Sequence, residues 1–104
     1  MKETVLWTNT GSTNPQTITL ADDWTNYKLL VLSMIYRPSG RTALISTCAS
    51  VAMMLQLYNN GENVELTPID NTNFITYVTT SDTKQLDYMT SRGPYVFYSI
   101  TGYS

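Results

Sequence analysis

Histidine is absent from the 104 residues of the chain, and cysteine occurs once, as Cys48. Without histidine the chain cannot build a Ser-His-Asp or Cys-His nucleophile arrangement, a histidine-ligated zinc site or a histidine pH switch. A single cysteine excludes an intrachain disulfide and a zinc site made of several cysteines. Cys48 lies in an apolar, strand-like run, so we expect it to be a small buried hydrophobic residue and not a nucleophile.

Charged residues are also scarce, at 13% of the chain, where a share of about 25% is usual. The 6 basic and 8 acidic residues leave a net charge of −2, which argues against a nucleic-acid partner. The apolar stretches are too short to span a bilayer, and we expect neither a signal peptide nor a membrane partner. Threonine (17), serine (9) and asparagine (8) replace the missing charge. Since threonine favours strands and the other two favour turns, the composition predicts a soluble β-domain.

Short apolar runs separated by turn residues predict a single all-β domain over residues 1–104. The runs predict strands at 5–7, 17–20, 27–37, 42–58, 64–66, 74–79 and 95–101. Asp22 and Asp23 can cap a brief helical turn between two of them. Seven to eight short strands with frequent turns are typical of an antiparallel, jelly-roll-like β-sandwich. We expect its core to contain Ile18, Leu20, Leu30, Leu32 and Phe97.

The segment 42–58 fits two structures. Val51, Met54, Leu55 and Tyr58 would share one face of a helix, whereas alternate residues from Val51 to Leu57 would share one face of a strand. Asn59-Asn60-Gly61 follows at once, and an Asn-Gly pair is a strong hairpin signal, so we predict the strand.

Two predicted strands, 27–37 and 95–101, carry apolar or aromatic residues on both faces. One face of each can pack into the core. The other must then meet a neighbouring copy of the chain or a ligand.

No constellation of residues predicts catalysis. Most carboxylates lie in predicted turns, where acidic residues are common, and no apolar surround is present to raise a carboxyl pKa. Asp70-Asn71-Thr72-Asn73 offers several oxygens to a calcium ion but lacks the glycine and distal glutamate of a calcium loop. The glycines are scattered and form no phosphate loop. We therefore expect no enzyme, no cofactor and no metal.

The polar stretch from Ser81 to Pro94 is interpreted as the longest exposed loop, and it holds the best candidates for ligand contact. Tyr88, Arg92 and Tyr95 could bind a sugar by ring stacking and hydrogen bonding. Gly93-Pro94 would stiffen the position of Arg92. An ordinary solvated loop, or one that another protein covers, is the alternative.

The first third of the chain contains Leu6-Trp7-Thr8-Asn9, the segment Gln16-Thr17-Ile18-Thr19-Leu20, and an acidic turn that leads through Asn26-Tyr27 into an apolar strand. In these features it resembles small β-domains of tailed-bacteriophage virion proteins. The resemblance is one of sequence pattern. It covers residues 3–37, and Ser99-Ile100-Thr101-Gly102-Tyr103 is loosely similar to the family's last strand. The middle of the chain departs from the pattern, so no binding residue is carried over.

The resemblance implies a non-enzymatic tail-fibre, tail-tip or head-fibre domain that is commonly trimeric. We expect a receptor-binding domain for host surface polysaccharide, which is assembled in the bacterial cytoplasm and works in the virion among other virion proteins. A purely structural head-fibre or decoration protein is the alternative. A small glycan hydrolase is the least favoured interpretation.

Overall fold

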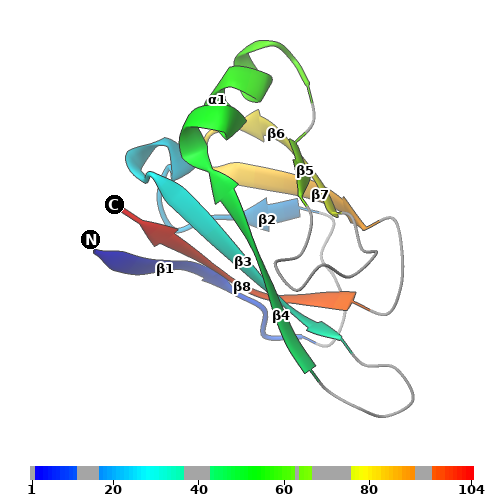
Figure 1. Cartoon of the computed structure of the whole chain (residues 1–104). Coiled ribbons are helices and arrows are strands. Elements are labelled where there is room, and N and C mark those ends of the chain that lie inside the picture. Colours follow the sequence, from blue (N-terminus) through cyan, green and yellow to red (C-terminus); the bar gives the residue numbers. More distant parts are fainter. Residues whose placement is uncertain (1, 12–16, 37–42, 63, 67–75, 91–94) are drawn as a thin grey trace.

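The computed structural model describes residues 2–11, 17–36, 43–62, 64–66, 76–90 and 95–104. Within them the chain is mostly β, with one short α-helix and one turn of 3-10 helix (Figure 1). The elements are β1 (Glu3–Thr8), β2 (Thr17–Thr19), η1 (Trp24–Asn26), β3 (Leu29–Tyr36), β4 (Ala43–Ser50), α1 (Val51–Asn59), β5 (Val64–Leu66), β6 (Thr76–Asp82), β7 (Gln85–Thr90) and β8 (Tyr95–Tyr103). No helix among these residues is long and apolar enough to cross a membrane.

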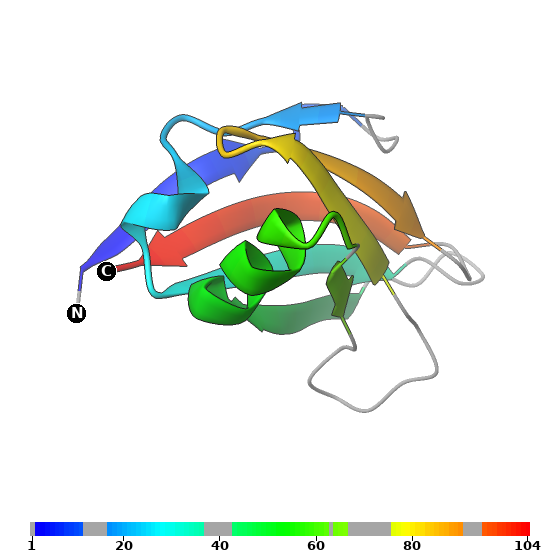
Figure 2. The same ribbon diagram turned by 90° about the horizontal axis from the view of Figure 1, so that it is seen from above.

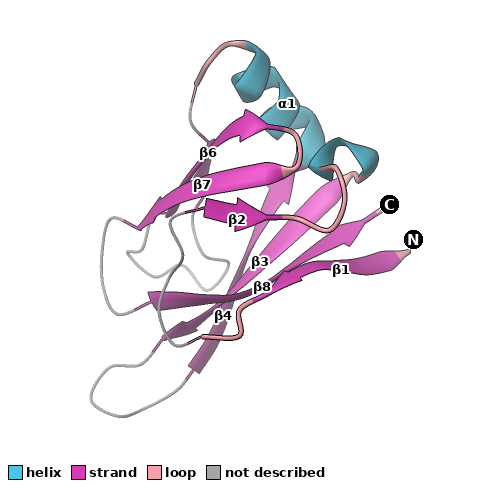
Figure 3. Cartoon of the chain, turned by 180° about the vertical axis from the view of Figure 1, so that it is seen from behind, coloured by secondary structure: helices cyan, strands magenta, loops and turns pink. Residues whose placement is uncertain are grey.

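The strands form two antiparallel sheets (Figures 1 and 3). The first sheet has the order β1-β8-β3-β4 and the second has the order β2-β7-β6-β5. Of the six longer strands, four make up the first sheet and β6 and β7 form the centre of the second, which the three-residue β2 and β5 extend. The described strands close into no barrel. The coarser part of the predicted fold class, a mostly β chain with antiparallel sheets, is thus confirmed, as is the brief helical turn, which is η1. The predicted capping is wrong for Asp23, the N-cap residue of η1, because its side chain makes no capping hydrogen bond.

Buried side chains from both sheets and from α1 form one core. Figure 2 shows the ribbons of the two sheets and of α1 from above. The predicted core residues are all buried within it: Ile18, Leu20, Leu30, Leu32 and Phe97. Trp24 of η1 and Met54 of α1 join them. Burial of this apolar area is the main force that holds the two sheets together.

The strand β3 shows how one run can be apolar on two faces. Leu30, Leu32 and Met34 are buried in the core, whereas the residues between them are half-buried on the other side of the sheet. Because successive side chains of a strand point to opposite faces, the second apolar set must lie on the outer face of the first sheet.

The predicted strand over 42–58 is correct only in its first half. Residues 43–50 form β4, but Val51 to Asn59 form the helix α1. Val51 and Met54 are buried at helical spacing, while Met53 is 50% exposed. A strand would have placed Val51 and Met53 on the same face, so the helical pattern describes the burial of this segment.

The Asn-Gly pair that favoured a hairpin instead ends this helix. Asn60 is its C-cap, and Gly61 follows with a φ of 71°. The N–H of Gly61 donates to the Tyr58 carbonyl over 3.1 Å, and the N–H of Glu62 donates to the Leu57 carbonyl over 2.8 Å. These two bonds make a Schellman motif, which needs the left-handed backbone that glycine supplies. The same Asn-Gly pair can therefore signal either a hairpin or the end of a helix.

The long exposed loop predicted at 81–94 is also wrong over most of its length. Residues up to Asp82 belong to β6 and residues 85–90 form β7, so the two strands make a hairpin. Between them the Asp82 carboxylate accepts a hydrogen bond from the Lys84 N–H over 3.0 Å, which stabilises a tight turn. Residues 91–94 lie outside the described residues, as do the residues of the suggested calcium loop, 70–73.

Candidate binding surface

The carboxylate of Asp22, between β2 and η1, is the centre of a cluster of hydrogen bonds. This carboxylate accepts hydrogen bonds from the Tyr27 hydroxyl over 3.0 Å, from the Asn26 amide over 3.1 Å and from the Asp23 N–H over 2.8 Å. The Tyr27 ring packs against Gly102 of β8, where an added Cβ would lie 2.6 Å from the ring atom Cδ1. Only glycine leaves room for that ring. Asp22 therefore fixes Tyr27 against the first sheet.

Asp23 and Trp24, which follow Asp22 in the chain, connect this corner of the fold to the second sheet. The Thr83 hydroxyl donates to the Asp23 carboxylate, and the Trp24 N–H donates to the Thr83 carbonyl over 2.9 Å. The Trp24 indole meets the Tyr58 ring edge to face, with the centroids 5.8 Å apart. Among the described residues no group of three acidic or cysteine side chains could hold a metal ion. We assign this corner to the stability of the fold.

The hydrogen bonds to Asp22 predict a pH dependence of stability. The bond from Tyr27, followed by those from Asp23 and Asn26, lowers the pKa of Asp22 below its ordinary value of 3.8. A carboxyl with a lowered folded-state pKa contributes stability above its unfolded pKa and loses it as the pH falls through the folded value. The stability difference between wild type and Asp22→Asn should therefore be largest near neutral pH and vanish in acid.

Urea unfolding of both proteins from pH 7 down to acid measures this difference. Gln56→Ala, at an exposed position of α1, removes no titratable group and is the control, which should show no such trend. A difference between wild type and Asp22→Asn that stays constant over the whole range would contradict the assignment.

The outer face of the first sheet is a second, larger feature. The registers place Val5 of β1 opposite Thr101 of β8, Thr101 opposite Val31 of β3, and Val31 opposite Cys48 of β4. This row, Val5–Thr101–Val31–Cys48, crosses the whole sheet on the side away from the core. Val5 is 56% exposed, Cys48 is exposed, and the two residues between them are half-buried. The prediction that Cys48 is buried is wrong, because its neighbour Ala49 takes the core side of β4.

Two further rows flank this one on the same face. One contains Glu3, Tyr103, Leu29 and Ser50 in consecutive strands; the other contains Thr8, Ser99, Ser33 and Ser46. The hydroxyls of Ser33 and Ser46 lie 3.3 Å apart and form a hydrogen bond across the strands. Glu3, at one corner, is the single charged residue of the three rows. We name these three rows the outer face.

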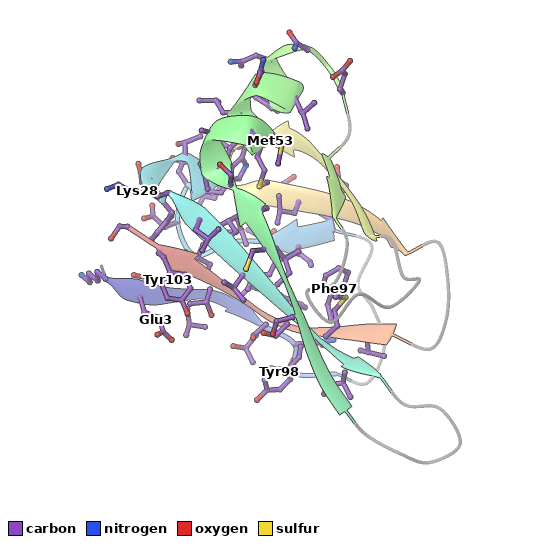
Figure 4. The ribbon with its side chains drawn as sticks, in the orientation of Figure 1. Glu3, Lys28, Met53, Phe97, Tyr98 and Tyr103 are labelled. Carbon is purple, nitrogen blue, oxygen red and sulfur yellow. The ribbon has the colours of Figure 1, made fainter. Side chains whose placement is uncertain are left out.

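A β-bulge places an aromatic ring beside the outer face. The register between β3 and β8 shifts so that Tyr98 is the extra residue, and its side chain is 45% exposed (Figure 4). Asn9 stabilises the bulge, because its amide donates to the Phe97 carbonyl and its N–H donates to the Tyr98 carbonyl, both over 2.8 Å. A bulge leaves one residue out of the ladder and re-aims its side chain.

The residues proposed from sequence do not form a described site. Tyr88 lies on β7 opposite Val78 of β6, whereas Tyr95 begins β8 opposite Tyr36 of β3. The two tyrosines therefore belong to different sheets. Arg92 lies outside the described residues. Their role in binding stays a prediction.

Sequence reasoning located the outer face only indirectly. The apolar character of both faces of β3 indicated that some second surface would be covered. The exposed residues Val5 and Cys48 gave no such signal, since they lie in short or ambiguous runs. The rows emerge only when the strand order β1-β8-β3-β4 is known.

Comparison of the chain with models of protein families, with curated proteins and with solved structures found no match.

Proposed function

We propose that this chain is a non-enzymatic β-domain of a tailed-bacteriophage virion, which works by surface contact with other virion proteins. The outer face is the observation that carries the proposal. Its rows combine hydrocarbon and hydroxyl groups with one charge at a corner. A broad sheet face of this kind suits contact with another protein, because the central parts of protein–protein interfaces are poor in charged residues.

The resemblance of residues 3–37 to phage virion domains supports the same role. In the fold, these residues form β1, β2, η1 and β3. A jelly-roll-like β-sandwich is the finer description that we propose. The first strand pairs with the last, and the second pairs with the next-to-last, as in a jelly roll. The middle departs from that pattern, since β4 remains beside β3 and β6 joins β5 and β7.

A receptor-binding role at a fibre tip is the second candidate, with host surface polysaccharide as its ligand. One observation favours it: Tyr88 is near the end of β7 and Tyr95 begins β8, so both flank the segment that contains Arg92. Tyrosine rings could stack on sugars there, and an arginine could hydrogen-bond their hydroxyls. In either role the copies assemble in the cytoplasm of the host bacterium and leave within the particle.

An adsorption experiment separates the two roles. Particles that carry the double substitution Tyr88→Ala and Arg92→Ala should contain the chain in normal amount. If the chain binds the receptor, these particles should adsorb to host cells at least tenfold more slowly than wild type. Unchanged adsorption assigns the chain to the structural role, and a chain missing from wild-type particles contradicts both. A double substitution on α1, Gln56→Ala and Asn59→Ala, is the surface control, because both residues are exposed.

A further inference from the structure

The described strands of the two sheets include four edge strands, and three of these carry features that discourage pairing with another chain. β1 contains Glu3 and is interrupted by a bulge between Val5 and Trp7. β5 has three residues and contains Glu65. β2 also has only three residues. Charges, bulges and short length are the usual means by which natural proteins protect sheet edges.

The edge strand β4 has none of these protections. It is eight residues long and pairs with β3 residue by residue, from Ala43 opposite Tyr36 to Ser50 opposite Leu29, with no shift of register. No charged residue occurs between Arg41 and Glu62, a stretch that includes all of β4 and α1. Figure 2 shows β4 at the margin of its sheet.

The backbone of β4 determines what can bind there. In an antiparallel ladder, alternate residues direct their N–H and C=O groups to the neighbouring strand, and the residues between them direct theirs outward. Half of β4 therefore presents donors and acceptors away from β3. The complement of such an edge is another extended strand, which binds by main-chain hydrogen bonds.

We propose that the edge of β4 pairs antiparallel with β4 of a second copy of this chain, across a two-fold axis. Around such an axis each residue meets residues of the same segment, so a charge on the edge would lie close to its own copy. Like charges on facing strands destabilise pairing. The charge-free stretch that includes β4 satisfies this condition, and among the edge strands longer than three residues β4 alone does so.

The pairing would join two first sheets into one continuous sheet. The outer face of one copy would then continue into that of the other, which doubles the width of this face. Met53 of α1, which follows β4 directly, adds exposed apolar surface near the end of the edge. A two-fold contact gives even-numbered assemblies, a dimer or a dimer of trimers, and differs from the simple trimer that the family resemblance implies.

Purified chain tests this inference without any phage particle, so its outcome is independent of the proposed function. Light scattering should give twice or six times the monomer mass of 11.7 kDa at micromolar concentration. Cys48→Lys places a charge on β4 and should weaken the association at least tenfold. Thr25→Lys places the same charge at an exposed position of η1, outside the outer face, and should leave the mass unchanged.

Hydrogen exchange locates the contact. Amides of β4 should be protected in the assembly and exchange faster on dilution, while those of β1 should not change with concentration. Ser50→Lys, at another exposed position of β4, replaces Cys48→Lys if that variant does not fold. A monomer or a simple trimer, an unchanged mass for a folded β4 variant, or concentration-independent exchange of β4 would each overturn the inference.

Discussion

Substitution of Trp24 by alanine should lower the free energy of unfolding by about 3–5 kcal/mol, the range for aromatic residues removed from a core. Trp24 has no exposed surface, and its side chain belongs to the core that both sheets share. Its indole N–H lies 3.4 Å from the Asp82 carbonyl, and its ring meets Tyr58 of α1. The side chain of Trp24 thus connects η1 to the β6–β7 turn and to α1. Chemical denaturation measures the loss.

The neighbouring residue is the control for Trp24. Thr25 is exposed in the same turn of 3-10 helix, so Thr25→Ala should change stability by no more than about 0.5 kcal/mol. A domain of this size has a total stability of about 5–15 kcal/mol, so Trp24→Ala should be close to unfolded at the lower end of that range. Equal effects of the two substitutions would show that η1 does not pack into the core.

Leu32→Ala should cost about 2–5 kcal/mol, as other large-to-small changes in cores do. Leu32 is 2% exposed at the centre of β3, opposite Ile100 of β8. Truncation removes buried methyl groups and leaves a cavity between the sheets, which the surrounding strands can fill only in part. Thermal and urea unfolding both report the loss.

Val31, the next residue of the same strand, is the matched control. It points to the outer face and is half-buried, so Val31→Ala should cost about 1 kcal/mol or less in the isolated chain. The comparison tests directly which face of β3 is the core. If Val31→Ala were the more damaging of the two, the assignment of inner and outer faces would be reversed.

The elements that sequence predicted correctly are those in which one period dominates. Thr17-Ile18-Thr19-Leu20 alternates cleanly, and both of its apolar residues are buried. The run 27–37 is apolar on both faces and predicted a strand, and Leu30 and Leu32, the two of its residues expected in the core, are buried. A run shows one clear period when one of its faces is buried and the other is not, so its pattern predicts which residues the fold buries.

The elements that sequence missed are those in which two periods fit equally well. Val51 agrees with either a helix or a strand, and the local turn signal at Asn60-Gly61 occurs at hairpins and helix ends alike. The packing of α1 beside Trp24 decides the outcome, and that contact joins residues far apart in the chain. β6 overlaps the strand predicted at 74–79, but β7 was missed because its apolar residues are too few to show an alternation.

The binding surface could be predicted less well than the fold. Tyrosine content directed attention to Tyr88 and Tyr95, which lie on different sheets. The outer face instead depends on residues such as Thr101 and Val31 that are ordinary components of any strand. Their alignment in one row follows from strand order, which local patterns do not contain.

The recovery of an outer-face variant in virions tests the central claim most directly. Thr101→Arg places a large charge in the middle of the row between Val5 and Val31, and Thr25→Arg places the same charge on exposed η1. Both proteins should fold, which circular dichroism checks before assembly. In gradient-purified particles, wild type and Thr25→Arg should be present in equal copy number, and Thr101→Arg should be reduced at least tenfold. Wild type missing from the particles, or Thr101→Arg incorporated as fully as wild type, would contradict the account.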